Sequence, residues 1–387
     1  MIDERHIAAK PEDIGVDSER LEAVFARVRR DIDDGVLPSA QVAVARRGKI
    51  AGLRTFGAAV QDGVEQPATG ETLYCIYSCT KAIVAAAVWL LFEDELLRLD
   101  ERVAEIVPEF GTNGKDAVTV EQVLLHTAGF PRAPFPTEHW GDRDKLLAAF
   151  GNWRLTWQPG SRFEYHATSA HWLLSEIILR RSGVDYKTFI HDRLTEPMGL
   201  DELFIGLPDE QASRAAEVRY QSEAVEPPGG WGEVTPEALL RFNQPHVRRA
   251  GAPGAGGFAS AAELALFYQP LINGGETASG KRIMKQETID FATTVRTDDR
   301  HRDLFNNPVN RALSVTVAGD DGKANMRGMG RVASARTFGH GGAGGQIGWG
   351  DPETGISLGH CTNGFVDYMT IGRRLTAVSS LAAGCAQ

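Results

Sequence analysis

The order of the expected strands and helices predicts an α+β fold, in which an all-helical domain is inserted into an antiparallel sheet domain built from both ends of the chain. Small and β-branched residues alternate within residues 42–59 and predict a strand pair near the N-terminus, and further strands are expected within 336–362. Helical signals dominate from about 100 to 275. We therefore expect a discontinuous sheet domain at 1–97 and 276–387, flanked by N- and C-terminal helices, and a mostly helical domain at 98–275.

Local signals justify the elements of the N-terminal part in turn. Asp17 can cap a helix whose apolar residues repeat with the helical period up to Gly35. The strand pair follows, with a turn at Arg47-Gly48. Residues 72–77 then lead into an apolar helix that is expected to run from Ser78 to about Leu97.

Capping signals mark the helices that follow. Thr119 with Gln122 and Ser260 with Glu263 form two candidate capping boxes. Between these helices, residues 218–257 are rich in proline, glycine and arginine, and we expect long loops there. The other elements are expected at 172–181 (a helix), after Asp185 (a helix), at 336–339, 346–350 and 356–362 (strands) and at 368–381 (a closing helix).

Composition narrows the class of function. The 387 residues include 42% hydrophobic side chains, which suits large buried cores, and carry a net charge of −10. Since the chain has no long basic run, we do not expect nucleic acid or an anionic membrane as a partner. The composition leaves small-molecule chemistry as the expected role, and it does not predict an oligomeric state.

The termini and the cysteines bear on the expected location. Residues 1–6 are charged and resemble no secretory signal, and the longest apolar run, at 82–92, is too short for the roughly 20 residues that cross a bilayer. The four cysteines show neither a C-x-x-C pair nor metal-type spacing, so we expect reduced, mostly buried thiols. These observations predict a cytoplasmic location.

Ser78 and Lys81 stand three residues apart at the start of the expected apolar helix. Positions i and i+3 project from one face of a helix, so the Lys81 amine can reach the Ser78 hydroxyl. Burial of the lysine favours its neutral, proton-accepting form, and a helix start offers main-chain N–H groups to a developing oxyanion. The pair predicts a serine hydrolase in which Ser78 is the nucleophile and Lys81 the base.

Other chemistries find less support. Ser357 lies in a Gly-x-Ser-x-Gly pattern, but a turn precedes it and strand-like residues follow, which is the reverse of a nucleophile elbow. The histidines lack the His-Glu-x-x-His spacing of zinc hydrolases, so no metal is expected. Residues 251–257 lack the Gly-Lys-Ser/Thr ending of a phosphate loop, and we expect a tight loop near the cleft instead.

Several spaced motifs resemble those of the serine β-lactamase and penicillin-binding-protein superfamily, and within it the class C β-lactamase-like esterases, called family VIII carboxylesterases. The resemblance covers residues 15–364 and implies a β-lactamase-like fold with the active site between the sheet and the helical domain. The motifs that carry it are Ser78-Cys-Thr-Lys81, Leu124-Leu-His-Thr-Ala-Gly-Phe130, Tyr165, Gly256-Gly-Phe-Ala-Ser260 and Phe338-Gly-His-Gly-Gly-Ala-Gly-Gly345.

The resemblance implies roles for individual residues. Ser78 matches the family nucleophile, Lys81 its base, and Tyr165 the tyrosine that shuttles a proton between the serine and the leaving group. A lysine ammonium close by would favour the phenolate of Tyr165, and the two groups would titrate as a coupled pair. Without the flanking motifs, the expected role of Tyr165 would be that of an aromatic side chain at an interface, with its hydroxyl hydrogen-bonded.

His340-Gly341-Gly342 matches the third family motif, usually Lys-Thr-Gly, on a strand that lines the cleft. The match implies that these three residues bind substrate and that the Ala343 amide joins that of Ser78 in the oxyanion hole. The alternative is a glycine-rich hairpin without substrate contact. The aromatic side chains of Trp231, Phe258 and Trp349 either line the pocket or pack in the core, and we count Trp349 among the substrate-binding candidates.

Two departures from the family pattern bear on substrate choice. Ala167 stands where β-lactamases usually carry the asparagine that contacts a substrate amide. His340 replaces a lysine that attracts the β-lactam carboxylate, and with a reference pKa of about 6.5 it is mostly neutral at pH 7. Both changes weaken the case for penicillin or cephalosporin hydrolysis.

These observations predict a cofactor-free serine esterase that cleaves a small-molecule ester through an acyl-enzyme on Ser78. Two alternatives use the same site: transfer of the acyl group to an alcohol or amine, and cleavage of an amide or β-lactam. A third alternative is a catalytically silent protein used for binding or assembly. The sequence leaves the acyl and alcohol preferences open.

Overall fold

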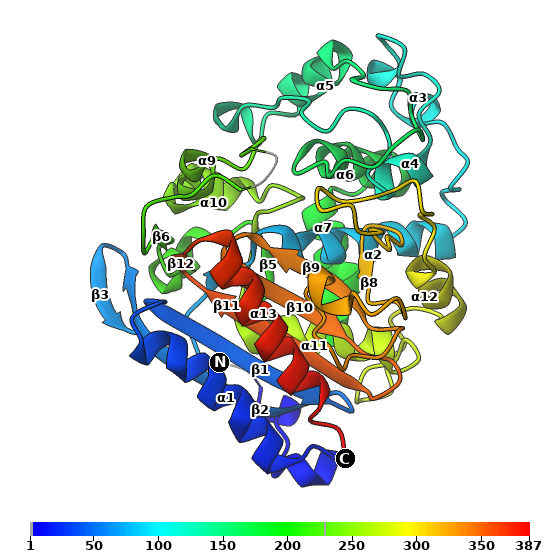
Figure 1. The fold of residues 1–387 in the computed structure, drawn as a ribbon. Coiled ribbons are helices and arrows are strands. Elements are labelled where there is room, and N and C mark those ends of the chain that lie inside the picture. Colours follow the sequence, from blue (N-terminus) through cyan, green and yellow to red (C-terminus); the bar gives the residue numbers. More distant parts are fainter. Residues whose placement is uncertain (1–2, 228–229) are drawn as a thin grey trace.

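A seven-stranded antiparallel sheet forms the lower half of the molecule in the view of Figure 1. The computed structural model describes residues 3–227 and 230–387. In sheet order the strands are β3 (Val64–Pro67), β2 (Lys49–Gln61), β1 (Ser39–Arg46), β11 (Ile356–Thr362), β10 (Gln346–Gly350), β9 (Phe338–Gly342) and β8 (Thr316–Val317). The predicted α+β fold with an antiparallel sheet is confirmed.

The two ends of the chain meet at the β1–β11 pair. Ala40 lies opposite Thr362 and Arg46 opposite Ile356, and β2 pairs with the other edge of β1. Strands β1 and β11 are buried along nearly their whole length, although both carry polar residues such as Gln41 and His360. This central pair joins segments more than 300 residues apart and fixes the position of β9, two strands away.

Helices cover both faces of the sheet. In Figure 1, α1 (Ser18–Asp33) and α13 (Tyr368–Ala383) run side by side across one face, where Val42 and Val44 of β1 join their core. Their alternating neighbours Ala43 and Ala45 face α11 (Ala261–Ile272) on the other side. The predicted boundary at residue 275 groups α11 with the helical part, whereas this helix packs against β1, β10 and β11.

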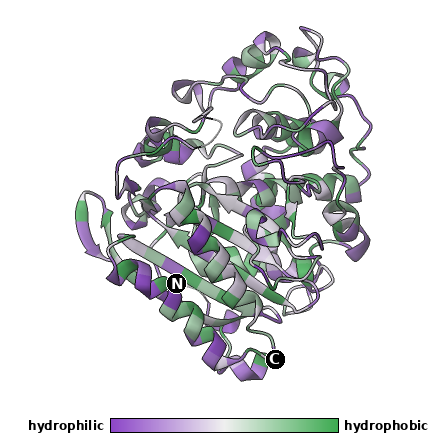
Figure 2. Ribbon diagram, in the orientation of Figure 1, coloured by the Kyte–Doolittle hydropathy of each residue, from purple (hydrophilic) through white to green (hydrophobic). Residues whose placement is uncertain are grey.

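The upper part of Figure 1 is mostly helical, and α2 (Thr80–Glu93) lies at its border with the sheet. This helix is apolar on nearly every face and is buried over residues 80–91. Figure 2 shows how polar residues gather on the outer helices. The remaining helices are α3 (Val103–Ile106), α4 (Val120–Leu124), α5 (Arg143–Asn152), α6 (Ser169–Ser182), α7 (Tyr186–Ile190), α8 (Glu196–Met198), α9 (Pro236–Leu240), α10 (Pro245–Ala250) and α12 (Gln286–Thr293). Short strands β4 (Tyr74–Cys75), β7 (Gly257–Ala259) and β5 (Phe204–Ile205) form a second sheet, and β12 (Gly364–Phe365) pairs with β6 (Arg219–Tyr220).

Most helix signals lie where the sequence places them. Asp17 caps α1, and Thr119 and Gln122 form both bonds of the capping box of α4. Ser260 caps α11 through the Glu263 N–H, but the Glu263 carboxylate accepts from the main-chain N–H of Glu202 instead of completing a box. Within the described part of the chain no helix is long and apolar enough to cross a membrane.

Two expectations about extent are wrong. The helix after Ser78 ends at Glu93 instead of Leu97, because Glu95 adopts a positive φ of 58° and the Leu96 N–H turns back to the Leu91 carbonyl. Residues 218–257 contain α9 and α10 where long loops were expected. Both helices start with proline at the first helical position, a site where its missing N–H costs nothing.

Candidate active site

Ser78 lies in a one-turn 3₁₀ helix, η3 (Tyr77–Cys79), between β4 and α2. The preceding Tyr77 holds a positive φ of 43°, which is strained for a bulky residue. Its hydroxyl donates to the Leu239 carbonyl at 3.0 Å, and its ring packs edge-on against Phe242 and Phe365. The anchored tyrosine therefore keeps the strained turn in place, and the turn presents Ser78, which stays partly exposed.

The Lys81 amine has three hydrogen-bond partners. Its Nζ lies 3.1 Å from Ser78 Oγ, and it donates to the carbonyls of Ala167 at 2.7 Å and Gly254 at 2.6 Å. Carbonyl oxygens can only accept, so they occupy two N–H groups of the amine. In the neutral amine the remaining direction, toward Ser78, holds the lone pair.

Burial sets the charge of this lysine. Lys81 has no exposed surface, and desolvation lowers its pKa, while the nearby Tyr165 opposes the shift and Arg311 adds to it. No carboxylate forms an ion pair with Lys81 among the residues that the structure describes. The pair thus has the geometry and the electrostatics of a serine hydroxyl facing a general base.

Tyr165 lies beside Lys81, between α5 and α6. Its ring centroid is 5.1 Å from Lys81 Nζ, 4.8 Å from the ring of His126 and 6.0 Å from that of His340. Its hydroxyl is buried and forms no hydrogen bond of ordinary geometry in the described residues, so no direct bond joins it to Ser78. It nevertheless interacts with the Lys81 amine, whose pKa it raises.

His126 and His166 hold the segment that carries Tyr165. The main-chain N–H of Glu164 donates to the His126 carbonyl at 3.2 Å, and that of His166 donates to His126 Nδ1 at 3.1 Å. His166 in turn bonds the Glu164 carbonyl and the Phe130 N–H through its two ring nitrogens. Burial lowers the pKa of His166 to about 4 and that of His126 well below its usual value, so both rings are neutral near pH 7.

The predicted substrate-binding strand reaches the site as β9. The Cys79 thiol donates to the His340 carbonyl at 3.1 Å, which sets this strand beside η3. His340 is buried, and desolvation, followed by the Arg311 charge, lowers its pKa well below the usual value. A Cβ atom at Gly342 would collide with the Ile76 carbonyl, so glycine permits the approach of the strand end to the turn that bears Ser78. Ala343 begins the next turn, η10 (Ala343–Gly345).

One predicted substrate-binding residue, Trp349, and the rejected rival nucleophile, Ser357, both lie outside the site. Trp349 was expected to bind substrate, but its side chain is fully buried in the core beneath α13, where Nε1 donates to Ser379 Oγ at 3.1 Å. The expectation is wrong because alternation along β10 turns Trp349 to the α13 face. Ser357 is buried in the middle of β11, with its hydroxyl donating to the Ala265 carbonyl and accepting from Gln269.

The structure adds residues that sequence reasoning did not select. Arg311, in the loop before β8, has its guanidinium 5.4 Å from the Tyr165 ring centroid. Glu233 accepts a hydrogen bond from Thr168 at 3.0 Å, and burial raises the pKa of its carboxyl to about 7. Arg311 and Glu233 come from loops without a sequence motif, so nothing in the sequence marks them as site residues. Gly254, which accepts a hydrogen bond from Lys81, is different, because the glycine run at 251–257 already pointed to a loop near the site.

Fold and site together define a serine hydrolase of the β-lactamase type. A sequence model of the Beta-lactamase family matches residues 24–380, and the chain belongs to that family. Esterase/beta-lactamase LipL of Mycobacterium tuberculosis is 30% identical over 314 residues, which cover 76% of this chain and 69% of LipL.

Solved structures agree with this assignment. A penicillin-binding protein homolog from Caulobacter crescentus superimposes with a TM-score of 0.80 at 28% identity, over 95% of this chain and 98% of that one. A family VIII carboxylesterase superimposes with a TM-score of 0.76 at 25% identity, over 94% of this chain and 98% of that one. The resemblance to the β-lactamase-like superfamily and its esterases is confirmed.

Proposed function

We propose that this chain is a serine carboxylesterase that forms an acyl-enzyme on Ser78. The observation that carries the proposal is the Lys81 amine, which is buried and forms no ion pair with any described residue. It lies 3.1 Å from Ser78 Oγ, while two carbonyls occupy its other positions. Such an amine can take the hydroxyl proton only through the lone pair that faces Ser78.

In the acylation step, Ser78 Oγ attacks the ester carbonyl carbon and its proton passes to Lys81. The main-chain amides of Ser78 and Ala343 are the proposed oxyanion donors, because β9 ends beside the η3 turn. Tyr165 gives its hydroxyl proton to the departing alkoxide, and the Lys81 ammonium restores it. Water then attacks the acyl group by the reverse sequence of proton transfers, which regenerates Ser78.

The two departures from the family pattern, at Ala167 and at His340, favour esters over β-lactams as substrates. Ala167 offers no side-chain amide, and its carbonyl is already committed to Lys81. His340 is uncharged near pH 7 and its Nδ1 bonds the Gly341 carbonyl at 2.7 Å, so it cannot attract a carboxylate as a lysine does. Because a relative is named as both esterase and β-lactamase, β-lactam hydrolysis is the second candidate function.

Labelling with a fluorophosphonate followed by peptide mapping tests the proposal. We expect the label on Ser78, and its loss in Ser78→Ala with no change in the matched variant Ser357→Ala. Label on Ser357 alone would contradict the proposal, and absence of label would favour a binding or assembly role.

Rates on p-nitrophenyl butyrate and on a chromogenic cephalosporin then separate the two activities. We expect the ester to be the better substrate by at least about 100-fold in kcat/KM, a difference that a missing substrate contact at a polar position can produce. A higher kcat/KM for the cephalosporin would assign the site to β-lactams. Release of butyrate esters instead of butyric acid in the presence of an alcohol would reveal acyl transfer.

A further inference from the structure

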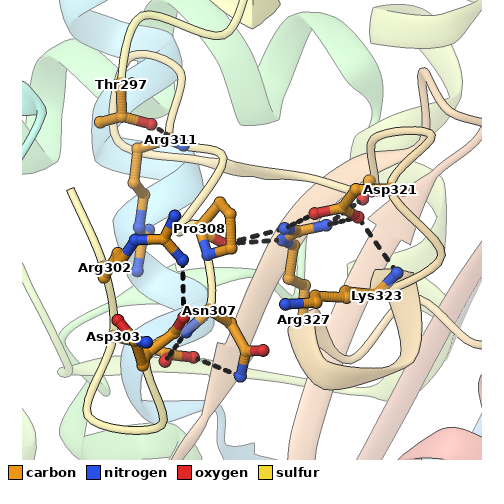
Figure 3. Close-up of polar contacts among 11 residues, drawn as sticks. Thr297, Arg302, Asp303, Asn307, Pro308, Arg311, Asp321, Lys323 and Arg327 are labelled. Carbon is orange, nitrogen blue, oxygen red and sulfur yellow. Dashed lines mark hydrogen bonds and ion pairs between the residues drawn. The ribbon is translucent and has the colours of Figure 1, made fainter. Parts of the chain in front are cut away.

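Arg311 is a buried arginine without a counter-ion. Its side chain is only 8% exposed, Nη1 has no hydrogen-bond partner, and no carboxylate within ion-pair distance is found in the described residues. Figure 3 shows the contrast with Arg327, whose guanidinium reaches Asp321 at 2.6 Å and the Pro308 carbonyl at 2.8 Å. A buried cation is costly unless an anion compensates it.

The guanidinium faces two aromatic rings at the active site. Arg311 Cζ lies 5.4 Å from the ring centroid of Tyr165 and 5.9 Å from that of Phe163. The main chain of this loop is held without the guanidinium, because the Arg311 N–H donates to Thr297 Oγ1 and the Arg311 carbonyl accepts from the Arg296 N–H, both at 2.9 Å. The side chain is therefore not needed to fix the loop.

Among the described basic groups around Tyr165, Arg311 carries the guanidinium, a group that stays protonated in proteins. Burial lowers the pKa of Lys81 and drives those of His126, His171 and His340 well below their usual value. Burial also lowers the pKa of Arg311, but from 12.5. Glu233 is the one carboxylate of the site described above, and it lies with Thr168.

We propose that Arg311 supplies the fixed positive charge that stabilises the Tyr165 phenolate during proton transfer to the leaving group. The proposal rests on the proposed function. When Tyr165 gives its O–H proton to the leaving alkoxide, the negative charge spreads into the ring beneath the guanidinium and compensates it. The Lys81 ammonium, which holds the Ser78 proton, then reprotonates the phenolate, so one proton passes in total from Ser78 to the alcohol.

This assignment explains how the site works without the lysine that usually stands at the position of His340. A neutral imidazole contributes no charge there. The His340 ring lies 6.0 Å from that of Tyr165, and Arg311 reaches this tyrosine from the loop before β8, which pairs with β9. A cation is thus present beside Tyr165 but comes from another element of the fold.

Leaving-group dependence tests the proposal. In Arg311→Met we expect kcat/KM on an ethyl ester, whose leaving group needs a proton, to fall by about 100-fold, within the range of general acid catalysis. On the matched p-nitrophenyl ester, whose leaving group departs as an anion, we expect kcat/KM to fall by less than about 5-fold, because kcat/KM reports the acylation step and not the deacylation that both esters share. Arg311→Lys should recover most of the rate, and so should His340→Lys in the Arg311→Met background. Arg296→Met, on the same loop, is the control and should change neither substrate.

Other outcomes overturn the proposal. Equal losses on both esters would show a structural role, and failure of both lysine rescues would exclude a charge effect. A rise in KM confined to esters that bear a carboxylate would make Arg311 a substrate anion site. Fluorophosphonate labelling of the wild type separates the two claims. If Ser78 is labelled but Arg311→Met loses activity equally on both esters, only the Arg311 proposal fails; if Ser78 of the wild type is not labelled, the proposed function itself fails.

Discussion

The proposed base and the proposed proton donor differ in how completely their polar atoms are hydrogen-bonded. The Lys81 amine has three partners and is fixed. The Tyr165 hydroxyl and Nη1 of the neighbouring Arg311 are buried and form no hydrogen bond of ordinary geometry in the described residues. The difference indicates that the base is in place before substrate arrives, whereas the proton donor keeps its hydroxyl for the leaving group.

Removing the base should have the largest effect. We expect Lys81→Met to lower kcat/KM on every ester by about 10⁴-fold or more, as for other members of a nucleophile–base pair. Lys115→Met is a matched control, because Lys115 is also buried and donates to a carbonyl, that of Trp153, at 2.6 Å. If both variants lose activity equally, the loss at Lys81 reports folding instead of chemistry, and circular dichroism would show it.

Removing the unpartnered hydroxyl should have a smaller and selective effect. Tyr165→Phe keeps the ring that packs on His126 and loses the proton donor. We expect kcat/KM, which reports the acylation step, to fall by about 100-fold on alkyl esters and by less than about 5-fold on p-nitrophenyl esters. An unchanged rate on alkyl esters would place the proton donor elsewhere.

The pH profile should follow the charge of the base. Lys81 accepts a proton only as the neutral amine, so kcat/KM on a neutral ester should rise about tenfold per unit of pH and level off at its pKa. Because burial lowers that pKa, we expect the plateau to begin below pH 10.5. The ionised Glu233 carboxylate favours the ammonium form of Lys81, so Glu233→Gln should move the rising part of the pH profile to lower pH. A rise that continues to about pH 10.5 would mean that Lys81 is solvated.

A buried side chain outside the candidate site should affect stability alone. Trp349→Phe replaces a buried indole with a smaller ring and removes the hydrogen bond to Ser379. We expect the free energy of unfolding to fall by about 1 to 3 kcal/mol, with kcat/KM nearly unchanged. Urea denaturation and ester kinetics on the same samples check it. A specificity change would restore Trp349 as a substrate-binding residue.

The parts of the site that the sequence predicts are local ones. Ser78 and Lys81 share one helical turn, and Thr119 and Gln122 share one cap, so spacing alone places them. Trp349 fails because the pattern of a buried strand does not say which face meets the cleft. Arg311 could not be predicted for another reason. It contacts Tyr165 only because β8 pairs with β9, and no residue pattern within its own loop indicates that contact.

Trapping the acyl group itself tests the central claim most directly. Acid quenching during steady turnover of p-nitrophenyl butyrate, followed by peptide mapping, should find the butyryl group on Ser78 in the wild type and no acylated serine in Lys81→Met. A butyryl group on Ser357, or full acylation of Ser78 at an undiminished rate without the lysine amine, would contradict the account of a serine activated by Lys81.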